Sequence, residues 1–154
     1  MAHPELLLSN QLCFLIHRLD RAIAARYRPL LSRLGLTYPQ YLAMLALWEH
    51  RSLGVGRLCE LLDLDTGTVS PLLKRMEAQG LVERTRSSDD ERSVLVTLAE
   101  RGAALEEESR GVPGAMAGCL LAGEGEYGRI KELLSGLLAR LDDPSCMGGL
   151  QAHP

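Results

Sequence analysis

Cysteine is the residue type with the most distinctive chemistry in this sequence. The four cysteines are Cys13, Cys59, Cys119 and Cys146. They form neither a CxxC pair nor a zinc-like pattern with histidines, so we predict no metal site and no cofactor. In a reducing cytoplasm, thiols spaced this widely are buried apolar residues or reactive groups rather than structural disulfides.

Cys13 is the cysteine whose sequence neighbours could make its thiol reactive. It precedes Phe14 in an apolar helical stretch, and His17 follows one turn later. A reactive thiol needs hydrogen-bond donors or positive charge to stabilise its thiolate. His17 could contribute, and the available hydroxyl donors are Tyr27, Tyr38 and Tyr41. Spacing alone does not bring these groups to Cys13, so an inert core cysteine remains the alternative.

The stretch over residues 58–97 predicts a helix, a turn, a second helix and a hairpin. We expect the hairpin strands over 81–86 and 93–97, because the intervening residues are too charged to be buried. This order is typical of a winged helix-turn-helix. Such a unit places its second helix in a DNA major groove and a hairpin beside it.

The second helix of this unit is expected to begin near Thr66 to Thr68. Pro71 then lies near its first turn, where backbone N–H groups lack partners, and Gly80 is well placed to end the helix. The first helix is expected over 57–62. Cys59 lies within it beside an apolar leucine, so we predict that Cys59 is a core residue.

Polar and basic side chains of the second helix and the hairpin are the predicted DNA contacts. Hydroxyl groups bind phosphates or base edges, and Lys and Arg neutralise phosphates. Asp90 is expected to pair with Arg92 and direct it towards a minor groove. The predicted contact residues are Thr66, Thr68, Ser70, Lys74, Arg75, Arg84, Arg86, Asp90 and Arg92. The alternative is a solvated hairpin with no partner.

Apolar helical patterns flank the DNA-reading unit over 6–34 and 98–142. Pro29 is expected to separate a short helix at 30–34, and Pro113 to kink the later helix. The leucine stripes would stay exposed on a lone small chain, so we predict a homodimer that binds a palindromic operator. Packing within one chain is the alternative.

Capping boxes mark two predicted helix starts. One is Thr37 with Gln40, and the other is Thr97 with Glu100. Together with the periodic segments they predict a mainly α fold with a small β-hairpin wing, flanked by N- and C-terminal dimerisation helices.

The length and composition favour a single domain. The chain has 154 residues, of which 46% are hydrophobic and 24% charged, and we expect residues 143–154 to form a loose tail. The net charge of -3 excludes a uniformly basic surface but permits a local basic patch. No apolar run is long enough to span a bilayer and no signal-peptide pattern is present, which predicts a cytoplasmic protein without a membrane partner.

Several ordered segments resemble one known family. The segments are Asn10-Gln11-Leu12-Cys13-Phe14, Leu34-Gly35-Leu36-Thr37-Tyr38-Pro39-Gln40-Tyr41, Leu64-Asp65-Thr66-Gly67-Thr68, Pro71-Leu72-Leu73-Lys74-Arg75 and Asp89-Asp90-Glu91-Arg92-Ser93. Through them, residues 7–141 resemble the MarR transcription regulators, most closely their organic hydroperoxide-sensing branch, OhrR.

The resemblance implies a dimeric repressor that leaves its operator when an organic hydroperoxide oxidises Cys13. Tyr27 and Tyr38 match tyrosines that hydrogen-bond the sulfur, with Tyr38 reaching across from the other subunit. His17 departs from the family pattern, which often has a tyrosine there. Cys119 resembles a resolving cysteine that pairs with the reactive one across the dimer. Cys146 is the other candidate for that role.

Such a reaction is stoichiometric, which predicts a regulator rather than an enzyme. The main alternative is a MarR-type repressor relieved by a small phenolic ligand without cysteine chemistry. A thiol peroxidase is a second alternative, but the sequence shows no motif for docking a reductant. A purely structural dimer is a third, and the predicted wing with its arginines disfavours it.

Overall fold

The computed structural model describes residues 3–86, 94–123 and 125–147. It forms two compact units, Met1–Pro113 and Gly114–Pro154. The predicted wing tip, with Asp90 and Arg92, lies outside the described residues. None of the described helices is long and apolar enough to cross a membrane.

The first long helix, α1, runs without interruption over Leu12–Ser32 and contains Pro29. The predicted break at this proline was therefore wrong. Pro29 lies in the last turn, where it costs one backbone hydrogen bond, and the fully buried Leu31 anchors that turn in the core. The helix also begins later than predicted, because two short 3₁₀ turns, Pro4–Leu6 and Leu8–Asn10, come before it.

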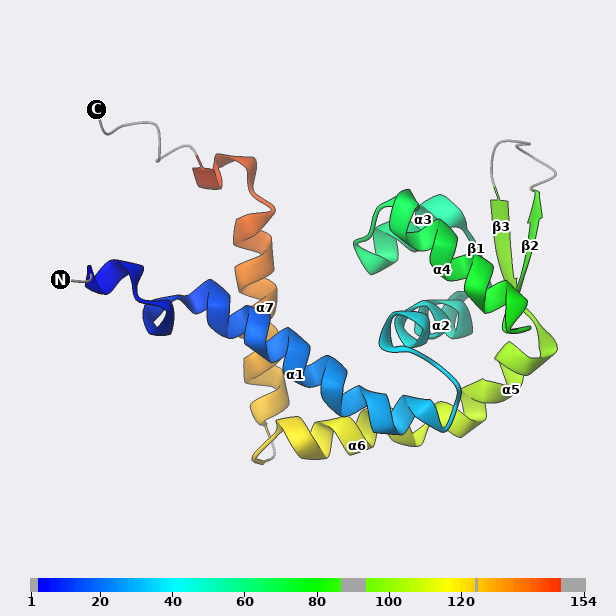
Figure 1. The fold of residues 1–154 in the computed structure, drawn as a ribbon, viewed down its shortest axis with the longest axis horizontal. Helices are drawn as coiled ribbons and strands as arrows, with labels where there is room; N and C mark the ends of the chain where they lie inside the picture. Colours follow the sequence, from blue (N-terminus) through cyan, green and yellow to red (C-terminus); the bar gives the residue numbers. More distant parts are fainter. Residues whose placement is uncertain (1–2, 87–93, 124, 148–154) are drawn as a thin grey trace. The chain divides into compact units, whose positions relative to one another are not determined.

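Helix α2, Tyr38–His50, begins at the predicted capping box. The Gln40 side chain accepts a hydrogen bond from the Thr37 backbone N–H at 2.9 Å, and the Thr37 side chain accepts one in return from the backbone of Gln40. This helix contacts both α1 and α4 (Figure 1), and its inward side chains are central to the core. They include Tyr41, Met44, Leu47 and Trp48.

Three short strands form an antiparallel sheet in the order β1-β3-β2. The predicted hairpin is present as β2, Val82–Arg86, and β3, Val94–Leu98. The third strand, β1, covers only Ser52–Gly54 and pairs with the far edge of β3. It was not predicted, because three residues are too few to show an alternating pattern.

The predicted capping box at Thr97 was wrong. Thr97 stays in β3 opposite Glu83 of β2, so α5, Glu100–Ser109, begins after Ala99 instead. Sheet pairing also keeps Leu98 in β3 opposite Val82, although a helix capped by Thr97 would need Leu98 as its first helical residue.

Helices α3, Val55–Leu62, and α4, Thr66–Ala78, form the helix-turn-helix between β1 and β2. The predicted start of α4 and its end before Gly80 are confirmed; Gly80 has a φ of 70°. Four side chains of α4 are buried in the core: Val69, Leu72, Leu73 and Met76. The mainly α winged helix-turn-helix predicted from the sequence is therefore present.

Gly102 of α5 lies where the chain has no room for a side chain. A Cβ atom there would approach the backbone carbonyl oxygen of Leu81 to 2.0 Å. The Gly102 carbonyl also accepts a hydrogen bond from the indole N–H of Trp48 at 2.9 Å. This glycine therefore allows α5 to pack closely against the start of the wing.

Replacing Gly102 with alanine is expected to lower the free energy of unfolding by about 3 kcal/mol, because the contacted atom belongs to the backbone and cannot rotate away. Urea unfolding followed by circular dichroism measures this. Gly56→Ala is the matched control, because nothing lies within 4 Å of its added Cβ. Its free energy of unfolding should be unchanged or slightly higher than that of wild type. An unchanged urea midpoint for Gly102→Ala would show that the packing is looser than described.

Residues 111–120 form helix α6, Gly111–Leu120, which crosses the boundary between the two units. The break after α5 lies at Arg110, three residues before the proline predicted to cause it. Pro113 is tolerated because it occupies the first turn of the new helix. Helix α7, Glu126–Leu141, follows, and residues 144–147 form a last 3₁₀ turn.

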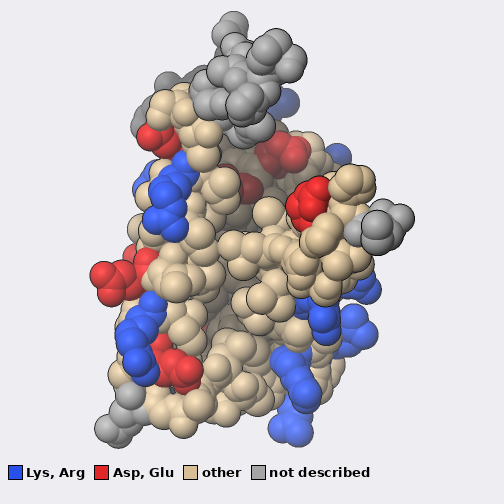
Figure 2. Space-filling model, turned by 90° about the vertical axis from the view of Figure 1, so that its left-hand side faces the viewer, with Lys and Arg blue, Asp and Glu red and all other residues tan. Residues whose placement is uncertain are grey.

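Large apolar side chains are exposed on the single chain. On α1 they are Leu12, Leu15, Ile16 and Leu19, and on α7 they are Ile130, Leu133, Leu134, Leu138 and Leu141. Figure 2 shows one face of the chain, on which uncharged residues form most of the surface. Such stripes mark surfaces that associate with another protein.

Candidate thiol sensor and DNA interface

The start of α4 is fixed by Asp65, its N-cap residue. One carboxylate oxygen accepts the Thr68 backbone N–H at 2.8 Å, and the other accepts the Thr68 hydroxyl at 2.9 Å. The hydrogen bonds from Thr68 lower the pKa of Asp65, so this cap stays ionised at neutral pH. The first turn of α4 is therefore held in place before any DNA arrives.

The outward face of α4 carries the side chains predicted to contact DNA. Thr66, Thr68, Lys74 and Arg75 are exposed, and Ser70 is half-buried. Since the opposite face of the helix is buried in the core, a duplex can reach only this polar face. This arrangement is the one that a recognition helix requires.

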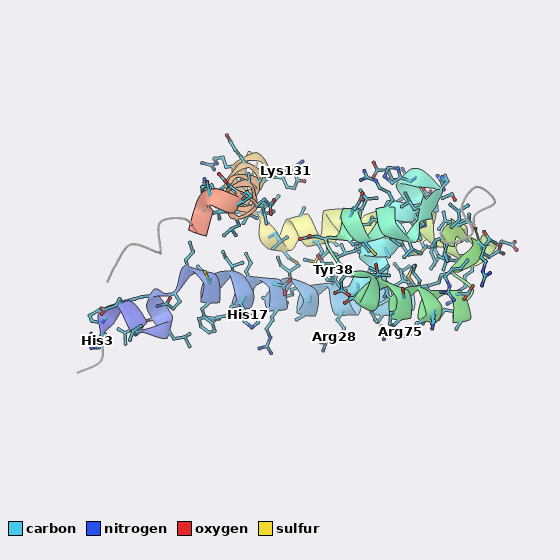
Figure 3. All side chains as sticks on the ribbon, turned by 90° about the horizontal axis from the view of Figure 1, so that it is seen from above. His3, His17, Arg28, Tyr38, Arg75 and Lys131 are labelled. Carbon is cyan, nitrogen blue, oxygen red and sulfur yellow. The ribbon has the colours of Figure 1, made fainter. Side chains whose placement is uncertain are left out.

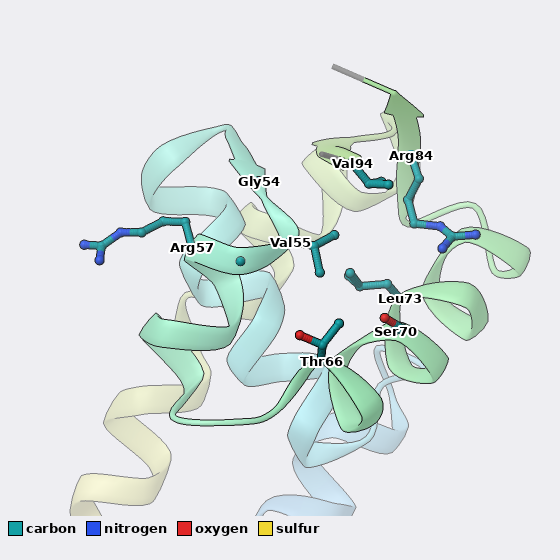
Figure 4. Close-up of a pocket in the computed structure, with 9 residues that line it drawn as sticks. Gly54, Val55, Arg57, Thr66, Ser70, Leu73, Arg84 and Val94 are labelled. Atoms are coloured by element: carbon teal, nitrogen blue, oxygen red, sulfur yellow. The ribbon is translucent and has the colours of Figure 1, made fainter. Parts of the chain in front are cut away.

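A groove of about 530 Å³ lies between the start of α3, α4 and the wing. Its lining includes Thr66, Ser70 and Leu73 of α4, and Arg84 and Val94 of the wing (Figure 4). Arg57 of α3 also lines it, which was not predicted. Arg57 could have been identified from the sequence, because it is a basic residue near the start of the first helix of a predicted helix-turn-helix.

Arg84 has an intramolecular partner that the sequence did not predict. Its guanidinium donates to a carboxylate oxygen of Glu77 on α4, at 2.7 Å from Nη2 and 3.0 Å from Nε. Hydrogen bonding from Arg84 is the main reason that the pKa of Glu77 is lowered. Arg84 therefore fastens the wing to the recognition helix, whereas Arg86 is exposed.

Cys13 lies at the beginning of α1 and is exposed on the single chain. His17, one turn later on the same helix, is exposed as well. Both lie among the exposed apolar residues of α1. The thiol is therefore not a core residue of its own chain, contrary to the alternative considered from the sequence.

The predicted tyrosines cluster, but not beside Cys13 of the same chain. Tyr27 stacks on Tyr38 with ring centroids 4.5 Å apart, and its centroid lies 5.6 Å from that of Tyr41. Tyr27 follows Cys13 by fourteen residues of continuous helix, a rise of about 21 Å. Figure 3 shows the separation: His17 lies in the N-terminal half of α1, and Tyr38 lies beside its C-terminal half.

Burial raises the pKa of Tyr27, Tyr38 and Tyr41 above the ordinary value. For Tyr38, the nearby Tyr27 and the charge of Asp20 raise it further. All three phenols therefore stay protonated at neutral pH. Each remains a hydrogen-bond donor of the kind that stabilises a thiolate.

The other three cysteines occupy different environments. Cys59, predicted to be a core residue, is half-buried and packs against the edge of the core, with its sulfur 3.8 Å from the Thr66 hydroxyl. Cys119 of α6 and Cys146 are exposed in the second unit. All four thiols are free in the structure.

Known proteins match this chain closely. The family model of the SarA/Rot transcriptional regulators matches residues 25–108. The organic hydroperoxide resistance transcriptional regulator of Bacillus subtilis (strain 168) is 48% identical over 134 residues, which are 87% of this chain and 91% of that protein. The chain belongs to the MarR/SarA family of transcription regulators. Its relatives are regulators rather than enzymes.

Solved structures of transcription regulators have the same fold as this chain. Reduced AbfR bound to DNA is 34% identical, covers 92% of this chain and 96% of its own, and superposes with a TM-score of 0.78. Disulfide-formed AbfR is 36% identical, covers 87% of this chain and 89% of its own, and has a TM-score of 0.60. AbfR is a protein of Staphylococcus epidermidis. This MarR-family chain therefore shares its fold with regulators solved on DNA and in an oxidised state.

Proposed function

We propose that this MarR-family chain is a homodimeric, cytoplasmic repressor that binds a palindromic operator and releases it when an organic hydroperoxide oxidises Cys13. The observation that carries the proposal is an exposed Cys13 in a chain 48% identical to an organic hydroperoxide regulator. Residues 58–97 read DNA, and the helices of 6–34 and 98–142 form the dimer. The whole chain acts as one domain in this proposal.

The dimer supplies the donors that Cys13 lacks within its own chain. Fourteen residues are about 3.9 helical turns, so Cys13 and Tyr27 lie on nearly the same face of α1. Antiparallel pairing of two α1 helices therefore places each Cys13 beside the tyrosine cluster of the partner. In this arrangement Tyr27 and Tyr38 both come from the other subunit, whereas His17 comes from the same one.

The chemistry follows from a thiolate held by protonated phenols. The Cys13 sulfur attacks the outer oxygen of the hydroperoxide, an S–O bond forms, the O–O bond breaks, and the alcohol leaves with a proton. Cysteine is oxidised to sulfenic acid and the peroxide is reduced. The thiol of Cys119 from the partner subunit then forms a disulfide with Cys13 and water leaves. Cys146 is the alternative resolving thiol.

A second candidate is release by a phenolic acid. NadR in complex with 4-hydroxyphenylacetate is 26% identical to this chain, with a TM-score of 0.66. In that case, the ligand would stabilise a form that does not bind DNA, and the thiols would not react.

Fluorescence anisotropy of a labelled duplex separates the two candidates. The duplex is selected from a random pool with the reduced protein. We expect cumene hydroperoxide to release it near one equivalent per protomer, and 4-hydroxyphenylacetate to leave it bound. The opposite pair of results would support the phenolic ligand.

A further inference from the structure

Gln40 lies between the tyrosine cluster and the recognition helix. It is the third residue of α2, two residues after Tyr38, and only 4% of it is exposed. Its side-chain amide donates a hydrogen bond to the side-chain carbonyl of Gln79 at 2.8 Å. Gln79 is the C-cap residue of α4. One buried amide therefore joins the first turn of α2 to the last turn of α4.

The end of α4 is held from a second side. The Gln79 backbone carbonyl accepts a hydrogen bond from the Arg101 guanidinium of α5 at 2.8 Å. The Gln40 to Gln79 bond borders a groove of about 550 Å³, which Arg75 and Ala78 also line. Figure 3 shows Arg75 on α4 and Tyr38 beside α1. The open groove gives the Gln79 side chain room to move.

Capping alone does not require an amide at position 40. Glutamate serves a capping box equally well, and its charge suits a helix N-terminus better. A glutamine can accept from the Thr37 N–H with its oxygen while its nitrogen donates to a second group. Gln40 uses both, since its oxygen accepts from Thr37 and its nitrogen donates to Gln79.

We infer that Gln40 is a positioning residue that couples the tyrosine cluster to the recognition helix through its hydrogen bond to Gln79. The inference rests on the proposed function. Oxidation of Cys13 disturbs the hydrogen bonds of Tyr38, the first turn of α2 shifts with it, and Gln40 carries the shift to the end of α4. Breaking the bond therefore weakens the link between oxidation and DNA release, and leaves oxidation itself unchanged.

The test compares Gln79→Leu, which cannot accept the bond, with Gln79→Glu, which retains an acceptor oxygen. For each protein, the operator Kd is measured before and after cumene hydroperoxide, and intact mass reports oxidation of Cys13. The readout is the ratio of the oxidised to the reduced Kd, a coupling between two sites. A merely structural role would weaken both affinities together and leave this ratio unchanged.

We expect the ratio to fall at least tenfold in Gln79→Leu and to stay within threefold of wild type in Gln79→Glu. Cys13 should be oxidised at the same peroxide dose in the wild-type protein and in both variants. Should Gln79→Leu fold poorly, the double variant Gln40→Glu with Gln79→Glu places two carboxylates opposite each other and is expected to show the same loss. An unchanged ratio in the variant that breaks the bond would overturn this inference alone. A wild-type ratio near one would overturn the proposed function and the inference with it.

Discussion

Replacing Cys13 with serine is expected to leave the operator bound at cumene hydroperoxide doses that release the wild-type protein. Serine is nearly the same size, but its hydroxyl is not oxidised by a hydroperoxide, so the first step cannot occur. We expect the dose for half-release to rise at least 100-fold, with the reduced Kd within about threefold of wild type. Anisotropy of the labelled duplex measures both quantities.

Cys59→Ser is the matched control for this prediction. Cys59 is half-buried against the core beside the recognition helix, so its substitution tests whether a cysteine within the DNA-reading unit responds to peroxide. We expect its release dose to equal that of wild type. If Cys13→Ser released the operator at the wild-type dose, Cys13 would not be the sensor.

Removing the positive charges of Lys74 and Arg75 together is expected to weaken operator binding at least 100-fold. Both side chains are exposed on the outward face of α4, where they can neutralise phosphates. The dimer presents each of them twice, so the double alanine variant removes about four ion contacts. The slope of log Kd against log salt should therefore fall by about 3.6, at roughly 0.9 per contact.

Lys131→Ala tests whether this effect belongs to α4. Lys131 is an exposed basic residue on α7, outside the DNA-reading unit, and its removal changes the charge of the chain without touching α4. We expect its Kd and salt slope to match wild type. Equal losses in both variants would mean that net charge, and not the recognition helix, determines binding.

The recognition helix was predictable because its signals are local. Leu72, Leu73 and Met76 recur at helical spacing, and Asp65 stands immediately before the helix, where an N-cap residue belongs. The capping box at Thr37 is equally local, and it is present in the structure.

The features that the sequence did not reveal depend on tertiary or quaternary contacts. α1 continues through Pro29 because the buried Leu31 holds its last turn. The helix expected to follow Thr97 begins later because Leu98 is paired with β2. The ion pair of Arg84 with Glu77 required the wing to fold back onto α4. The separation of Cys13 from Tyr27 becomes evident only once α1 is known to be one helix.

In the proposed mechanism, oxidation of Cys13 causes release of DNA, and one titration measures both events together. Reduced protein on the labelled operator receives cumene hydroperoxide in steps. Each sample is divided between anisotropy and intact mass after free thiols are trapped with an alkylating agent. We predict that the bound fraction falls in proportion to the Cys13 thiol that remains alkylatable. Release of the operator while Cys13 is still fully alkylatable would contradict the account.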